Sequence, residues 1–131
     1  MREISAKAIE DTVRELCIQA NRHLPADICR RVDEAHRQET KPLAQDIMQD
    51  LLDNIDAAEA MQLPVCQDTG MAVVFVRLGQ EVHITGGLLE EAVNRGISRG
   101  YVDGRLRCSV VGDPLRRVNT GDNTPAAITL R

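Results

Sequence analysis

Four side chains with different chemistry stand consecutively in Cys66-Gln67-Asp68-Thr69-Gly70, directly before the most strand-like run of the chain. As a local pattern this is a turn, in which Asp68 caps the backbone two residues on and Gly70 takes a positive φ. The alternative is a metal-binding thiolate at Cys66, with neighbours that hydrogen-bond a substrate. Loops at strand ends commonly carry such groups. The residues alone leave both interpretations open.

A second candidate lies in "GRLRCSVVGD", residues 104–113, which predicts a strand. Side chains alternate between the faces of a strand, so Arg105, Arg107 and Ser109 share one face and Cys108 lies on the opposite, core side. Two neighbouring arginines repel unless an acid or an anion neutralises them. They therefore predict either a solvated surface or ion-paired network, or a carboxylate clamp, since a guanidinium matches a carboxylate in two parallel hydrogen bonds.

A third segment, "NTGDNTPA" (119–126), is rich in turn residues. Asn, Gly and Asp favour a tight loop, and Pro125 opposes a helix there. The segment lacks the lysine of a P-loop and the glycine spacing of a dinucleotide fingerprint. It therefore predicts a loop and no nucleotide site.

Hydrophobic periodicity and capping residues predict three helices in the first part of the chain. Ser5 can cap the first, Pro25 can open the second, and Thr40 with Pro42 marks the third, which continues to about Met61. Cys17 lies on the apolar stripe of the first helix, and we expect it in the core.

The period changes after Leu63. β-branched runs predict strands at 71–78, 104–113 and 124–130, with a short partner strand at 79–85 and a helix over 86–101. The prediction is a single α+β domain over residues 1–131. A three-helix layer, about 1–62, precedes a mixed sheet with one inserted helix, about 63–131.

Composition narrows the function classes. The net charge of −4 and the 2% aromatic content argue against a nucleic-acid or membrane-surface partner. No apolar run approaches the length of a membrane span, and "MREISAKAIE" lacks the apolar region of a secretory signal, so we expect a cytoplasmic protein. The four cysteines form no Cys-x-x-Cys pair, and we expect thiols or metal ligands rather than disulfides.

Together, "PVCQDTGMAVVFV", "LRCS" and "NTGDNTPA" resemble the N-terminal part of the class I fumarate hydratase family, most closely the α subunit of its two-subunit form. The related L-tartrate dehydratase α subunits share the Cys-Gln-Asp-Thr-Gly core. The resemblance spans essentially the whole chain. It implies reversible hydration of a dicarboxylate, typically fumarate to L-malate, by an enzyme that holds a 4Fe-4S cluster with three cysteines.

Residue by residue, the resemblance implies that Cys66 is a cluster ligand. It implies that Gln67 and Asp68 contact the substrate, with Asp68 in proton transfer, and that Arg107 holds a substrate carboxylate. A thiolate suits iron-sulfur ligation, and an open iron acts as a Lewis acid. A nearby carboxylate can move the carbon-bound proton.

Only one of the three cluster cysteines has a match in this chain. We therefore expect a piece of a longer α subunit that is inactive alone, forms homo- or hetero-oligomers, and shares its site with the rest of that subunit and a β subunit. One alternative is a non-catalytic interaction module that keeps the fold without the activity. Another makes Cys66 a nucleophile or redox thiol, although it has no resolving cysteine nearby and no evident histidine base unless His83 approaches it in space.

Overall fold

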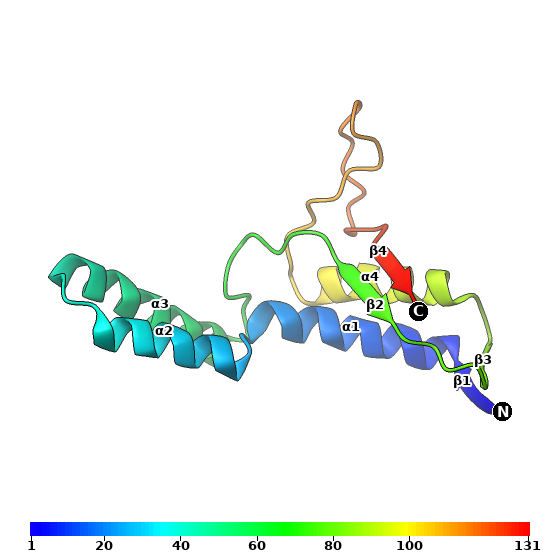
Figure 1. Cartoon of the computed structure of the whole chain (residues 1–131). Helices are drawn as coiled ribbons and strands as arrows, with labels where there is room; N and C mark the ends of the chain where they lie inside the picture. Colours follow the sequence, from blue (N-terminus) through cyan, green and yellow to red (C-terminus); the bar gives the residue numbers. More distant parts are fainter. The chain divides into compact units, whose positions relative to one another are not determined.

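Four helices and four short strands follow one another along residues 1–131, all of which the computed structural model describes (Figure 1). They confirm the α+β class. Contacts divide the chain into a sheet-bearing unit, residues 1–19 with 67–131, and a helical unit, residues 20–66. The elements are, in order, β1 (Arg2–Ser5), α1 (Ala6–Arg22), α2 (Ala26–Gln38), α3 (Pro42–Met61), β2 (Val73–Val76), β3 (Val82–Thr85), α4 (Leu89–Asp103) and β4 (Ala127–Leu130).

The three predicted helix starts are confirmed. Ser5 Oγ accepts a hydrogen bond from the Ala8 N–H at 3.1 Å, which satisfies one of the first-turn donors of α1. Pro25 directly precedes α2, and Pro42 occupies the first turn of α3, where no intrahelical N–H bond is lost.

Strand pairing differs from the predicted mixed sheet. The structure contains two separate parallel pairs, β1 with β3 and β2 with β4. The partner strand expected for β2 is present as β3, but it pairs with β1, which the sequence analysis does not predict. Beyond β2 the Leu78 N–H donates to the carbonyl of Arg131, so the chain continues along β4 instead of turning back as a hairpin.

The strand predicted over 104–113 is wrong. Arg105 has a φ of 56°, and the Ser109 and Val110 N–H groups donate to a side chain instead of a neighbouring strand. Only Val111 forms an isolated bridge, with Asn119. The predicted alternation of burial nevertheless holds: Leu106 and Val110 are buried, Cys108 is half-buried, and Arg105, Arg107 and Ser109 are exposed.

The core of the sheet-bearing unit lies where α1 packs on α4, and Cys17 belongs to it as predicted. Small residues let the two helices approach. A Cβ atom on Gly96 would lie 2.6 Å from the carbonyl oxygen of Glu10 and 2.7 Å from Val13 Cβ. The buried core side chains are Val13, Cys17, Val93, Ile97, Tyr101 and Leu106.

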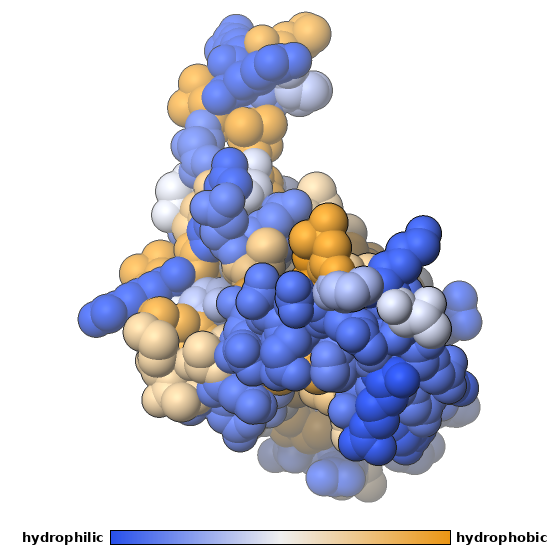
Figure 2. Space-filling view, turned by 90° about the vertical axis from the view of Figure 1, so that its left-hand side faces the viewer, coloured by the Kyte–Doolittle hydropathy of each residue, from blue (hydrophilic) through white to orange (hydrophobic).

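In the helical unit, α2 packs against α3. Three large aliphatic side chains of α3, Leu43, Ile47 and Leu51, remain exposed one helical turn apart. In the view of Figure 2, hydrophilic residues predominate. None of the four helices combines the length and the hydropathy that a membrane-spanning segment needs.

The close helix approach predicts the effect of Gly96→Ala. We expect the free energy of unfolding to fall by about 1–3 kcal/mol, because the overlap outweighs the gain of roughly 1 kcal/mol in helix propensity. Urea denaturation measures this. In the control Gly79→Ala, the new Cβ would meet Val82 Cγ2 at an ordinary 3.6 Å, and the change should stay within about 0.5 kcal/mol. Equal effects of the two substitutions would contradict the packing argument.

Candidate functional site

The turn of residues 66–70 lies between α3 and β2. Cys66 is the last residue of the helical unit and is exposed. Gln67 and Asp68, in the sheet-bearing unit, are also exposed, whereas Thr69 is buried with 9% of its surface accessible. Gly70 has a φ of 58°, as the turn pattern predicts. The turn thus presents an amide and a carboxylate to solvent while its hydroxyl points into the protein.

Thr69 joins this turn to the segment that carries Arg107. Its Oγ1 donates a 2.8 Å hydrogen bond to the carbonyl oxygen of Arg107, 38 residues along the chain. Its own carbonyl oxygen accepts a 2.9 Å hydrogen bond from Tyr101 Oη, which is buried near the end of α4. The structure therefore brings the backbones that carry Asp68 and Arg107 together and anchors both to α4.

Asn123 also joins these two segments. It is completely buried and has a φ of 62°. Its Nδ2 donates to the carbonyl oxygen of Gly70 at 2.9 Å. Its Oδ1 accepts from the Ser109 N–H at 2.6 Å and from the Val110 N–H at 3.0 Å.

The sequence analysis misses both of these anchors. It treats Asn123 only as a turn residue and does not single out Tyr101. An asparagine next to a glycine-aspartate pair suggests positive φ, but nothing local indicates which backbone groups its amide will meet. The single tyrosine of an aromatic-poor chain was a usable signal, since a buried tyrosine hydroxyl usually has a hydrogen-bond partner.

Arginines in the sheet-bearing unit fall into two groups. The ion pairs of this unit engage Arg14, Arg95 and Arg99, whereas Arg105 and Arg107 are exposed and take part in none. The ion-paired network that the sequence allows for these two therefore does not form, whereas a solvated surface and a carboxylate clamp both agree with their exposure. Their guanidinium groups remain available for an anion.

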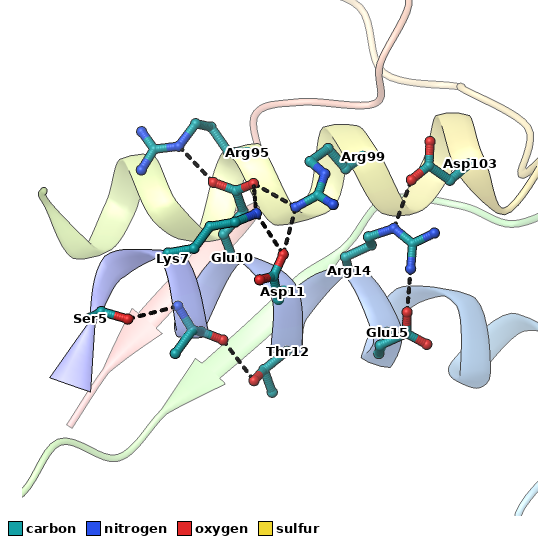
Figure 3. Close-up of polar contacts among 11 residues, drawn as sticks. Ser5, Lys7, Glu10, Asp11, Thr12, Arg14, Glu15, Arg95, Arg99 and Asp103 are labelled. Carbon is teal, nitrogen blue, oxygen red and sulfur yellow. Dashed lines mark hydrogen bonds and ion pairs between the residues drawn. The ribbon is translucent and has the colours of Figure 1, made fainter. Parts of the chain in front are cut away.

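The paired arginines surround a buried acid of α1 (Figure 3). Glu10 accepts hydrogen bonds from Arg99 Nη1 at 2.6 Å, Arg95 Nε at 3.0 Å and Lys7 Nζ at 3.2 Å. These three cations lower the pKa of Glu10 to about 2, with Arg99 contributing most. Beside them is a cavity of about 350 Å³, which Asp122 of the loop 119–126 also lines. The cluster fixes α4, and hence Tyr101, relative to α1.

The cysteines differ in their suitability as metal ligands. Burial raises the pKa of the Cys17 thiol to about 11, and burial, followed by the Asp122 carboxylate, raises that of Cys108. Both shifts oppose the thiolate form that binds metal. Cys29 is half-buried in α2, and Cys66 is exposed. Residues 1–131 contain no group of three or more His, Cys, Asp or Glu side chains arranged to hold a metal ion.

A family model described as fumarate hydratase (Fumerase) matches residues 10–131. The chain belongs to the fumarate hydratase family. The resemblance stated from the sequence is thereby confirmed. The match includes α2, α3 and α4 and every residue of the candidate site.

Individual relatives carry two kinds of name. A putative L(+)-tartrate dehydratase subunit alpha of Methanocaldococcus jannaschii is 31% identical over 122 residues, which cover 89% of this chain and 42% of that protein. The aerobic class I fumarate hydratase of Salmonella typhimurium is 37% identical over 107 residues, 73% of this chain and 18% of that protein. The L(+)-tartrate dehydratase subunit alpha of Escherichia coli is 25% identical over 120 residues, 92% of this chain and 39% of that protein. The chain thus spans less than half the length of these relatives.

The low pKa of Glu10 predicts how stability depends on pH. The folded state holds this carboxyl ionised to about pH 2, whereas its ordinary pKa is 4.5. Its contribution is therefore complete above about pH 4.5 and is lost as the pH falls toward 2. Relative to Glu10→Gln, we expect an advantage of the unaltered chain that is constant near neutrality and shrinks below pH 4.5. Urea midpoints at several pH values measure it.

Glu81→Gln is the control, because Glu81 is exposed and takes part in no ion pair of the structure. Its midpoints should follow those of the unaltered chain at every pH. A Glu10→Gln variant whose deficit stays the same from neutrality down to about pH 2 would contradict the ion-pair assignment.

Proposed function

We propose that this chain forms the substrate-orienting part of a hydro-lyase that reversibly hydrates a dicarboxylate, with fumarate and L-malate as the first pair to test. The hydrogen bond from Thr69 to the Arg107 carbonyl carries the proposal. This hydrogen bond joins the segment of Asp68 to the segment of Arg107. It uses neither the Asp68 carboxylate nor the Arg107 guanidinium, and both residues are exposed. Relatives named for fumarate hydratase and for L(+)-tartrate dehydratase support the reaction class.

In this proposal Arg107 binds one carboxylate of the substrate. Its guanidinium is not already neutralised by an acid of the chain, in contrast to Arg95 and Arg99. The planar fork offers two parallel hydrogen bonds to a carboxylate, which fix orientation as well as position. In a chain with a net charge of −4, this local positive charge offsets repulsion of a doubly negative substrate.

Asp68 and Gln67 act on the other part of the substrate. In the dehydration direction the Asp68 carboxylate accepts the carbon-bound proton while hydroxide departs from the adjacent carbon. In the hydration direction the same group returns the proton. Such a base works when it lies within hydrogen-bond reach of the reacting carbon, directly or through one water. The Gln67 amide donates to a substrate oxygen and accepts from a hydroxyl, which helps to orient the substrate.

For the cofactor we propose a shared site. Cys66 directly precedes Gln67 and is exposed, so its thiolate can supply one ligand of a 4Fe-4S cluster. The other ligands would come from polypeptide outside this chain, in the remainder of an α subunit, and a β subunit would complete the assembly. This sharing explains why residues 1–131 lack a metal-binding group of their own. The chain alone is then inactive.

The same lack of a ligand set is also what a non-catalytic interaction module would show. Anaerobic assembly of this chain with the remaining α-subunit sequence, a β subunit, iron and sulfide separates the two functions. Hydratase activity in the cluster-loaded complex supports the enzymatic function. A fully assembled, cluster-loaded complex with no activity on fumarate or tartrate would leave the interaction module as the function.

The role of Asp68 predicts the effect of Asp68→Asn in the assembled enzyme. We expect turnover to fall by roughly 10²–10⁴-fold, since the amide cannot accept the proton, while iron content stays unchanged. Asp113→Asn is the matched control: Asp113 lies in an exposed loop, where Oδ1 accepts from the Leu115 and Arg116 N–H groups, and the amide oxygen can do the same. Full turnover of the Asp68→Asn enzyme would remove this carboxylate from the mechanism.

The shared cofactor site predicts the outcome of anaerobic reconstitution. Residues 1–131 incubated with iron and sulfide should retain no stoichiometric cluster, because Cys66 lacks the other ligands. Iron content and visible charge-transfer absorption measure this. A stable, stoichiometric cluster would mean that the remaining ligands lie in this chain or in a second copy of it. The assignment of ligands to other polypeptide would then be wrong.

A further inference from the structure

Asn123 is the most buried polar side chain of the protein, with no accessible surface. All its side-chain hydrogen bonds go to backbone groups of two other segments. Nδ2 donates to Gly70, two residues after Asp68. Oδ1 accepts from Ser109 and Val110, two and three residues after Arg107. One planar amide thus joins the two segments that carry the candidate substrate-binding groups.

We propose that Asn123 is a positioning residue for the reaction: its amide sets the spacing between the turn of Asp68 and the segment of Arg107. This inference rests on the function proposed above, which it deepens. Neither segment belongs to a helix or a strand. Their separation is therefore held by side chains, and a misplacement of about 1 Å at a reacting group can reduce turnover by roughly two orders of magnitude.

The chemistry of the position favours asparagine over similar side chains. Two converging N–H groups require an acceptor, and the Gly70 carbonyl requires a donor, so only an uncharged group with both can serve. Aspartate would place a negative charge against the Gly70 carbonyl. The φ of 62° further favours asparagine, which tolerates left-handed backbone better than most residues.

The loop 119–126 holds Asn123 in place through its own hydrogen bonds. Asn119 Oδ1 accepts from the Gly121 N–H at 2.7 Å, and its Nδ2 donates to the Cys108 carbonyl at 2.8 Å. Asp122 Oδ1 accepts from the N–H of Thr124 at 3.1 Å and from its hydroxyl at 2.7 Å. The buried amide is therefore carried by a loop that is itself fixed on both sides.

A titratable replacement tests the donor and the acceptor separately. In Asn123→Asp, the neutral carboxyl can donate to Gly70 and accept from Ser109 and Val110, as the amide does. The ionised carboxylate keeps the acceptor and repels the Gly70 carbonyl. In the 131-residue chain, amide NMR signals of 67–70 should be native-like at low pH and move as the introduced group ionises. The Ser109 and Val110 N–H groups stay hydrogen-bonded to the carboxylate, so their signals should move with the same midpoint while their exchange with solvent stays slow.

Asn94→Asp is the matched control. Asn94 also bridges two segments, accepting from the Ala126 N–H at 2.9 Å and donating to the Glu90 carbonyl at 3.1 Å, but it contacts neither candidate segment. Its replacement should leave the signals of 67–70 as they are in the unaltered chain at every pH. Signals of 67–70 that do not respond to the titration of Asn123→Asp would overturn the proposal.

Kinetics of the assembled enzyme supply the second measurement. At a pH where the introduced carboxyl is ionised, kcat of Asn123→Asp should fall by at least about tenfold and KM should change by less than about threefold, because the Arg107 segment keeps its acceptor. Lowering the pH should restore kcat relative to the unaltered enzyme. Equal losses in kcat and in affinity, without recovery, would indicate a merely structural role and contradict positioning.

The experiments distinguish a failure of the proposed function from a failure of the role assigned to Asn123. If the unaltered assembly has no hydro-lyase activity, the proposed function fails, and the NMR titration still decides whether Asn123 sets the spacing. If Asn123→Asp does not fold, Asn123→Gly replaces it, since glycine accepts the positive φ without strain. This substitution removes both the donor to Gly70 and the acceptor for Ser109 and Val110, so the signals of 67–70 and of Ser109 and Val110 should all move. Unmoved signals would overturn the proposal.

Discussion

The close approach of α1 and α4 is the constraint on which the sheet-bearing unit depends. Gly96 and Gly100 leave room for the backbone and side chains of α1, and Glu10 joins the two helices through Arg95 and Arg99. Burial of a carboxylate is unfavourable unless charged partners compensate for the lost water, as three cations do here. Packing and ion pairs therefore both stabilise the contact between α1 and α4, and they fix the position of α4 in the sheet-bearing unit.

What α4 carries is the candidate site. Tyr101 anchors the turn after Gln67 through the Thr69 carbonyl, and Asn94 anchors the entry to β4 through the Ala126 N–H. Loops supply the chemical groups, whereas a helix with its own core supplies their rigidity, as is usual where binding residues lie on loops. The two parallel pairs are short, four residues a strand, and two strands alone give little independent stability. Order at the site thus comes mainly from the helix pair.

Sequence reasoning succeeded where structure is decided locally. Ser5, Pro25 and Pro42 mark helix starts because capping and proline effects act within one turn. It failed at 104–113, where the alternating pattern is that of a strand. There the Asn123 amide takes two N–H groups that a ladder would otherwise use. That competition joins residues 13 and 14 positions apart, and no local pattern contains it. The parallel partner β1 was missed for the same reason: its register with β3 spans about 80 residues.

The sequence proposes the residues of the candidate site but does not predict its geometry. The motif indicated Cys66, Gln67, Asp68 and Arg107, yet the side chains that join their segments are neutral: a threonine, a tyrosine and an asparagine. This choice has a physical consequence. Neutral hydrogen bonds do not change with protonation over the range in which carboxylates titrate. An ion pair between Asp68 and Arg107 would instead occupy the charges that the proposed binding of a dicarboxylate uses. In the sheet-bearing unit, the acids that do pair with arginine lie on α1 and α4, where they stabilise the scaffold and leave Arg107 available for an anion.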